Sequence, residues 1–205
     1  MNKIWFRTDE KEDAIAAMAM FAESSSRLLN DDKYWKWAIV SLHNVFQSAM
    51  IIFLRMGDDF LVMRQEDAEA WLAAHENGDP YPETKMDSFM NLYGKLKKTA
   101  RGGYRFKPKG QQGRSVKMLN LFRNQFIHFM PMGWSIEMNG MPSICKDCLD
   151  IIKELEENFL CIRWADEEQR EHFNTFLEQA IVNVIKVAAA YKQLTTGSTG
   201  SLRAP

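Results

Sequence analysis

Apolar side chains recur along most of this chain at the three- and four-residue spacing of an α-helix, with polar side chains between them. This periodicity predicts helices almost throughout. An antiparallel bundle is the natural way for such helices to bury their apolar faces, so the chain is expected to be all-α. The expected helices cover residues 9–30, 32–56, 66–76, 83–100, 114–129, 143–163 and 166–194.

The pattern changes in two places. In the segment WSIEMNGMPS, Trp134, Ile136 and Met138 alternate with polar residues before Asn139-Gly140, which predicts a short hairpin or turn. The tail TTGSTGSLRAP, residues 195–205, is small and polar and is expected to be disordered. Residues 1–194 are then expected to form a single domain.

Composition supports a globular protein. With 205 residues, of which 46% are hydrophobic, the chain can bury a sizeable core. The first residues, MNKIWFRTDEKED, are charged from the start, unlike a signal peptide. Polar residues interrupt the most apolar stretch, 35–56, which argues against a membrane span. A cytoplasmic protein without membrane association is expected.

The three cysteines are expected to pack in the core. Cys145, Cys148 and Cys161 could be combined on paper with His172 into a zinc site, but the chain has no second C-x-x-C and the spacing matches no common zinc module. Cys145 and Cys148 lie three residues apart on an expected amphipathic helix, where buried free cysteine is ordinary. No metal and no cofactor are therefore expected.

Residues 114–134, RSVKMLNLFRNQFIHFMPMGW, predict an amphipathic helix that Pro131 ends. On a helical wheel at about 100° per residue, Arg123 lies on the border of the apolar face and about 140° from His128. The helix is expected to dock on the core through that face. The face consists of Ser115, Met118, Leu119, Phe122, Phe126, Phe129 and Met130.

A second stripe of this helix faces away from the core and consists of Lys117, Leu121, Asn124 and His128. The stripe is either a solvated surface or a subunit interface. In the first case the helix dipole favours a histidine near the helix C-terminus. In the second, an exposed Leu121 between polar neighbours marks the contact with a second copy of the chain.

The segment Arg123-Asn124-Gln125-Phe126-Ile127-His128 resembles the R-x4-6-H motif of the HEPN superfamily. The longer run LRNQFIHFMPMGW, with Pro and Trp just after the motif, is similar to one bacterial branch of it. The resemblance covers residues 115–134, and elsewhere it extends only to helical architecture. It implies a HEPN-like helical bundle in which Arg123 and His128 are the motif's Arg and His and Asn124 is its polar second position.

The resemblance also implies a function. Active members of the superfamily are metal-independent endoribonucleases, generally homodimers whose two motifs meet across the interface, and they occur in toxin–antitoxin and phage-defence systems. The partners that the resemblance implies are RNA, a second copy of the chain and, in a toxin–antitoxin system, an antitoxin. In this mechanism His128 would transfer a proton and Arg123 would stabilise the charge on the phosphate. Asn124 would orient either the imidazole of His128 or the phosphate.

Charge is distributed unevenly along the chain. Residues 1–84 carry 8 basic and 15 acidic groups, residues 85–123 carry 11 basic groups and only Asp87, and residues 124–205 carry 7 and 11. The middle segment interleaves aromatic residues, Tyr104 and Phe106, with its cations. Attraction to phosphate combined with aromatic stacking is typical of proteins that bind single-stranded nucleic acid.

This basic segment leads directly into the motif helix, which favours RNA binding over a loop that is merely solvated. The predicted RNA-binding residues are Lys95, Lys97, Lys98, Arg101, Tyr104, Arg105, Lys107, Lys109, Arg114 and Lys117.

A polar stripe of His43, Asn44, Gln47 and Ser48 interrupts the apolar second helix. These side chains either satisfy one another and the backbone, which is the more ordinary situation, or line a functional cleft.

Three functions are compatible with the sequence. The first is a dimeric, metal-independent endoribonuclease. The second is a non-catalytic HEPN-like module that binds RNA, a nucleotide or a partner protein through the same basic cleft. The third is a scaffold protein in which the motif is incidental.

Overall fold

The computed structural model describes residues 3–55, 57–128, 133, 135–158 and 161–197. Within these residues every regular element beyond two isolated β-bridges is an α-helix, which confirms the all-α prediction. The helices are α1 (Glu10–Arg27), α2 (Tyr34–Leu54), α3 (Gln65–Asn77), α4 (Phe89–Lys98), α5 (Gln112–Ile127), α6 (Met141–Glu157) and α7 (Glu167–Gly197).

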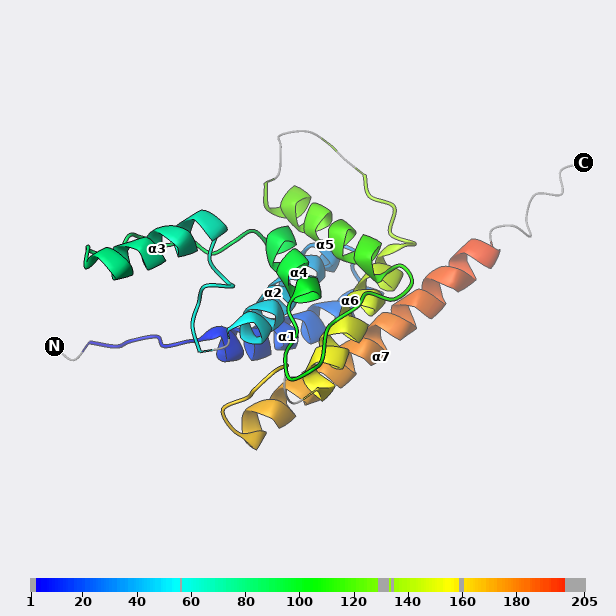
Figure 1. Cartoon of the computed structure of the whole chain (residues 1–205). Coiled ribbons are helices and arrows are strands. Elements are labelled where there is room, and N and C mark those ends of the chain that lie inside the picture. Colours follow the sequence, from blue (N-terminus) through cyan, green and yellow to red (C-terminus); the bar gives the residue numbers. More distant parts are fainter. Residues whose placement is uncertain (1–2, 56, 129–132, 134, 159–160, 198–205) are drawn as a thin grey trace, which may run out of the picture.

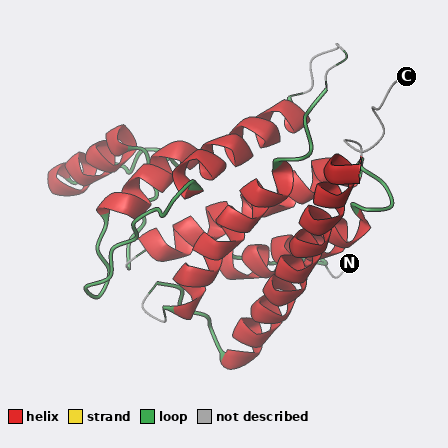
Figure 2. Ribbon diagram, turned by 90° about the vertical axis from the view of Figure 1, so that its right-hand side faces the viewer, coloured by secondary structure: helices red, strands yellow, loops and turns green. Residues whose placement is uncertain are grey.

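Helix α2 forms the centre of the bundle. It packs against α1, α4, α5 and α6, and the long α7 runs along α1 and α6 on the other side (Figure 1). Figure 2 shows the same helices from the side as a layered bundle. The position of α2 follows from its sequence, since both its faces are rich in apolar residues and therefore need neighbours on both sides.

By length and composition alone, α2 is also apolar enough to cross a membrane. However, 72% of the apolar stretch of α2 that meets this criterion is buried inside the protein. Residues such as Ile39, Leu42, Phe46 and Phe53 are fully buried against the surrounding helices. Among the described residues α2 is thus the core helix of the bundle.

Helix α4 is shorter than the expected 83–100 because the residues before it bond elsewhere. Met86 forms an isolated bridge with Met63, and the backbone N–H of Asp87 donates to the carbonyl oxygen of Val62 at 2.9 Å. The helix then begins after Ser88, whose Oγ accepts the N–H of Asn91 at 3.3 Å.

Helices α6 and α7 also end at positions that differ from the prediction. Asn158 is extended, and the N–H of Cys161 donates to its carbonyl oxygen at 2.7 Å, so the chain turns after Glu157 instead of continuing to residue 163. Helix α7 continues to Gly197, three residues beyond the expected end of the domain. Residues 198–205 of the expected disordered tail lie outside the described part of the chain.

Helix α3 is separate from the bundle and packs on none of the other described helices (Figure 1). It is held by aromatic stacking instead. The ring of Trp71 stacks on that of Tyr81 with centroids 4.5 Å apart, and it meets Phe60 edge-on at 5.1 Å. Helix α3 is therefore an elaboration of the domain rather than part of its core.

The expected core positions of the cysteines are confirmed. Cys145, Cys148 and Cys161 are all buried free thiols, and burial raises the pKa of Cys145 to about 12. In the segment before α6, Asn139 and Gly140 form the predicted turn, whereas the described residues 133 and 135–140 contain no strand. The hairpin alternative is therefore not found there, and Trp134 lies outside the described residues.

Candidate functional site

Helix α5 lies on the bundle with one face inward, as the wheel predicts. Ser115 and Leu119 are buried, and Phe122 and Phe126 are partly buried against the core. The helix packs against α2, α4 and α6. The predicted face also included Phe129 and Met130, and these two residues, like Pro131, lie outside the described part of the chain.

Arg123 lies at the edge of this inward face. Its Nη1 donates to Oδ1 of Asn124 at 3.1 Å. Its Nε is buried and has no hydrogen-bond partner. The neighbouring amide therefore holds Nη1 of the guanidinium. Nε, by contrast, is removed from water without a hydrogen bond in exchange, which is costly and uncommon in a protein.

His128 is the C-terminal cap of α5, with φ −99° and ψ 57°, and its side chain is exposed. Its backbone N–H donates to the carbonyl oxygen of Asn124 at 2.9 Å. Asn124 therefore contacts both other motif residues, through its side chain to Arg123 and through its carbonyl to His128. Along a regular helix Arg123 and His128 are about 7.5 Å apart in height and about 140° apart in direction.

His43 of α2 is a fourth residue of this region, and the sequence did not assign it to the motif. It is only 2% exposed, and its Nε2 lies 3.2 Å from Oδ1 of Asn120 on α5. Its ring stacks on Phe89 at the start of α4, with centroids 4.0 Å apart. Because an amide oxygen can only accept, Nε2 carries the proton in this arrangement and Nδ1 presents a lone pair.

The electrostatics connect His43 to the motif. The pKa of His43 is lowered from its ordinary value of 6.5 to about 4, mainly by burial; the Asn120 hydrogen bond opposes this shift, and the positive charge of Arg123 adds to it. The imidazole is therefore neutral at pH 7. Its Nδ1 is buried without a partner, as is Nε of Arg123, so an uncompensated acceptor and an uncompensated donor occur in the same region.

Two other residues of the polar stripe on α2 contact neighbouring segments, whereas Asn44 is exposed. Ser48 donates through Oγ to Asp13 of α1 at 2.7 Å, and Gln47 lies against the sulfur of Met86 at 3.9 Å. These partners lie outside the stripe, and a functional cleft along it stays a prediction. The sequence does contain a signal that Asn120 belongs to the candidate site. It lies three positions before Arg123, and residues three apart are neighbours on the surface of a helix.

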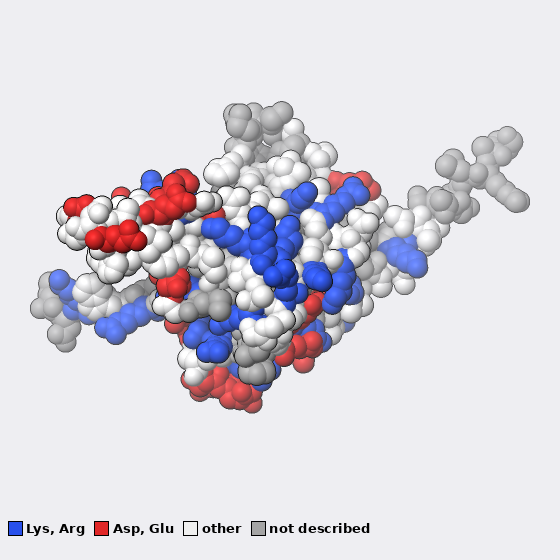
Figure 3. Space-filling view, viewed as in Figure 1, with Lys and Arg blue, Asp and Glu red and all other residues white. Residues whose placement is uncertain are grey.

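Six of the predicted RNA-binding residues are exposed cations that form no described ion pair. They lie at the end of α4, in the following loop and at the start of α5, and Figure 3 shows Lys and Arg gathered on this face of the molecule while acidic groups cover much of α3. Lys97 also lies over the ring of Tyr93, 4.7 Å from its centroid. We call this group the cation patch; it consists of Lys97, Lys98, Arg105, Lys107, Arg114 and Lys117.

Arg101 does not belong to this surface. It is 8% exposed, and its Nη1 donates to the carbonyl oxygens of Ile52, Phe53 and Cys161 at 2.9, 2.8 and 3.0 Å. It therefore caps the C-terminus of α2, whose last carbonyls have no partner within the helix. The prediction of Arg101 as a surface RNA-binding residue does not fit this position.

Three other predicted RNA-binding residues are engaged with protein groups. Lys95 Nζ bonds to Asp87 and to the carbonyl oxygen of Met63, both at 2.7 Å. The Tyr104 hydroxyl donates to Glu154 at 2.8 Å, and Lys109 pairs with the same carboxylate at 2.6 Å. The aromatic stacking expected of this segment is also reduced, because Phe106 is fully buried and Tyr104 is partly buried.

Proximity in sequence does not place the cation patch beside the motif. Arg114 and His128 are near opposite ends of α5, and at 1.5 Å per residue they are about 21 Å apart along its axis. An RNA that reaches both would have to follow α5 past Lys117.

The outward stripe of α5 is exposed as predicted. Lys117, Asn124 and His128 face solvent, and Leu121 is 47% exposed. Ile127, which the wheel did not single out, is 44% exposed beside His128. Two large apolar side chains therefore lie uncovered on the same helix as the motif.

Comparisons of this chain with protein-family models, with curated proteins and with solved structures find no match. The resemblance of residues 115–134 to the HEPN motif therefore stands on those residues alone.

Proposed function

We propose that this protein is a metal-independent endoribonuclease whose composite active site forms where two copies of α5 meet. The observation that carries the proposal is the exposed end of α5, where Asn124 contacts both Arg123 and His128. A guanidinium and an imidazole at one accessible helix end are the groups that metal-free RNA cleavage requires.

The proposed reaction is an internal transfer at phosphorus. The ribose 2′-oxygen attacks the adjacent phosphorus while one imidazole accepts the 2′-hydroxyl proton, and the bond from phosphorus to the 5′-oxygen breaks as a second imidazole donates a proton to that oxygen. The products are a 2′,3′-cyclic phosphate and a 5′-hydroxyl. Arg123 stabilises the negative charge that develops on the non-bridging oxygens in the transition state.

The position of the histidines favours a dimer. The chain has four: His43 is 2% exposed and therefore cannot contact RNA, while His75 and His172 belong to α3 and α7. One copy thus offers a single accessible imidazole at the end of α5. Two proton transfers need two such groups, and a two-fold axis beside Leu121 would supply the second from the partner.

His43 and Asn120 act in this proposal as positioning residues. His43 stays neutral and buried, so it adds no charge that would repel Arg123. Its hydrogen bond to Asn120 fixes α2 against the part of α5 that carries the guanidinium.

The experiment that tests the proposal identifies the products. Single-stranded RNA incubated with the wild-type protein in excess chelator is expected to yield 2′,3′-cyclic phosphate and 5′-hydroxyl ends. Arg123→Ala is expected to lower the rate by about a hundredfold or more, as loss of one transition-state donor does. The matched control, Arg7→Ala, removes an exposed arginine far along the chain and should cleave like wild type. Products with 5′-phosphate ends would contradict the mechanism.

A non-catalytic module is the second candidate. The separation along α5 favours it: Lys117, the patch residue nearest to His128 on this helix, is about 16.5 Å away along the axis, so RNA can occupy the patch without reaching the motif. Saturable RNA binding by the wild-type protein with no cleavage in either chelator or divalent metal would select this function over the first.

A further inference from the structure

A second basic region lies at the other end of α2, away from His43. A cavity of about 430 Å³ opens there between the start of α1, the end of α2, the Gly102 turn and the segment after α6. Nine residues separate His43 from Ile52 in its wall, a rise of about 13 Å along the helix. The cavity is therefore distinct from the candidate active site.

Among the described residues, four cations and no carboxylate line this cavity. They are Lys11, Arg55, Arg101 and Arg163, and the other lining residues are Ile52, Gly57 and Gly102. The two glycines have positive φ values of 105° and 55°, a backbone that favours glycine, and they add no side chain to the space. The walls therefore consist largely of basic groups.

Arg101 forms the fixed base of the cavity. Its Nη1 is occupied by three carbonyl oxygens, which hold the guanidinium in place. Its Nε and Nη2 make no described hydrogen bond and are not among the buried polar atoms without a partner, so solvent reaches them. Two donors of a side chain that is 8% exposed thus remain free for a ligand.

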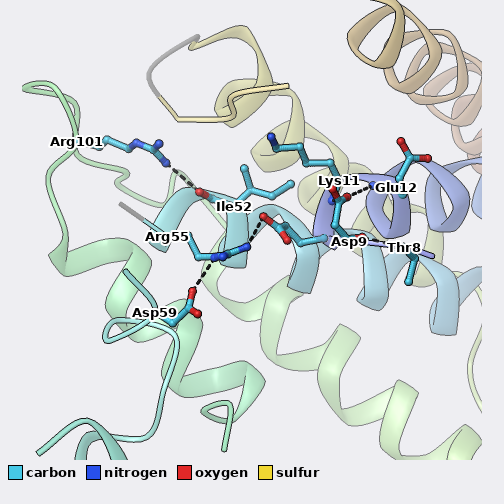
Figure 4. A network of polar contacts seen from close by, with 9 residues as sticks. Thr8, Asp9, Lys11, Glu12, Ile52, Arg55, Asp59 and Arg101 are labelled. Atoms are coloured by element: carbon cyan, nitrogen blue, oxygen red, sulfur yellow. Dashed lines mark hydrogen bonds and ion pairs between the residues drawn. The ribbon is translucent and has the colours of Figure 1, made fainter. Parts of the chain in front are cut away.

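The other cations surround this base. Figure 4 shows Lys11 extending from α1 toward Arg101 and Arg55 lying below, between Asp59 and α1. Arg55 is neutralised by Glu10 at 2.7 Å and Asp59 at 2.6 Å. Neither Lys11 nor Arg163 has a described side-chain hydrogen bond or ion pair, so their charges are uncompensated.

The uncompensated charges act on one another. Burial lowers the pKa of Arg101, and the positive charge of Arg163 lowers it further. Like charges around one small space destabilise the folded chain unless an anion enters. A bound anion would remove that repulsion and would use donors that the protein leaves free.

We propose that this cavity binds a small molecule carrying two or three linked phosphate groups. A chain of phosphates brings several negative charges into one compact volume, which matches a cavity of about 430 Å³ in which three of the four lining cations form no described ion pair. An internal phosphodiester of RNA carries one charge between two bulky sugars, so it places less negative charge against these cations. The inference does not depend on the proposed ribonuclease activity.

The test is a calorimetric titration of the full chain with inorganic pyrophosphate. The wild type is expected to bind at a single saturable site and to unfold at a higher temperature in its presence. The double variant Lys11→Ala, Arg163→Ala should bind at least tenfold more weakly and should still fold, because neither side chain has a described partner. The double variant Lys186→Ala, Lys192→Ala loses the same charge from exposed positions of α7 and is expected to bind within twofold of wild type.

Three results would overturn the proposal. The first is the absence of saturable pyrophosphate binding to the wild type. The second is an equal effect of the two double variants, which would attribute binding to net charge. The third is displacement of pyrophosphate by 5′-hydroxyl single-stranded RNA at equal or lower concentration, which would assign the cavity to the nucleic-acid backbone.

Discussion

At the scale of single residues, the buried region around His43 and Arg123 is incompletely satisfied. Nδ1 of His43 can accept and Nε of Arg123 can donate, yet neither has a partner. Each such group costs about 1–3 kcal/mol when it is removed from water. Buried groups without a partner are uncommon in folded proteins, which is a reason to place the candidate site in this region.

His43 should make stability depend on pH. Its pKa is about 4 in the folded chain and 6.5 ordinarily, so between these values the unfolded chain binds a proton that the folded chain does not. Stability is therefore lost as pH falls from 6.5 toward 4. Between pH 7 and pH 4.5 the free energy of unfolding of the wild type is expected to fall by about 2–3 kcal/mol more than that of His43→Gln, measured by urea denaturation. Equal losses in the two proteins would show that His43 titrates normally.

At the scale of elements, the periodicity of apolar residues is sufficient to predict the helices but not their ends. The ends depend on contacts outside the helices: the bridge from Met63 to Met86 delays the start of α4, and the turn from Asn158 to Cys161 ends α6.

The same limit affects the prediction of the candidate site. The wheel predicts the outward stripe of α5, which is local. It cannot predict that His43 meets Asn120 or that Arg101 caps α2, because these contacts join residues 77 and 49 positions apart.

The position of Arg101 changes the expected composition of the RNA-binding surface. Neutralising Lys97, Lys98 and Arg105 together should weaken RNA binding and make it less sensitive to salt, because each lost phosphate contact lowers the slope of log K against log salt by about 0.7 for single strands. Binding measured by fluorescence anisotropy across a salt titration checks this. The matched triple variant at Arg7, Lys186 and Lys192 should keep the wild-type slope. An unchanged slope in the first variant would reduce the cation patch to a solvated surface.

At the scale of the whole molecule, assembly determines whether the site is complete. Leu121 and Ile127 are exposed on the helix that carries the motif, and a monomer gains nothing from apolar side chains in water. Packing of the outward stripe against the same stripe of a second copy would bury Leu121 and bring two His128 side chains toward one axis. In this account, dimerisation and catalysis depend on the same surface.

Leu121→Asp should therefore separate the two copies. Two carboxylates would face each other near the two-fold axis without compensation, which is unfavourable at a desolvated contact. The variant is expected to keep its helical circular dichroism, to sediment as a monomer and to lose cleavage although Arg123 and His128 are intact. Leu194→Asp, at a 71% exposed position of α7, is the matched control and should sediment like wild type. A wild type that is monomeric at micromolar concentration and still cleaves RNA would show that one chain holds a complete site.

The central claim is that the imidazole of His128 transfers a proton during RNA cleavage, and a comparison of two histidine variants tests it most directly. His128→Ala and His172→Ala each remove one exposed imidazole, the first from the end of α5 and the second from α7. Cleavage of single-stranded RNA is measured in excess chelator, with folding verified by circular dichroism. The account predicts that His128→Ala is slower than wild type by about 10²–10⁴-fold, the usual contribution of a general acid or base, while His172→Ala is unaffected. Wild-type cleavage by folded His128→Ala would contradict it.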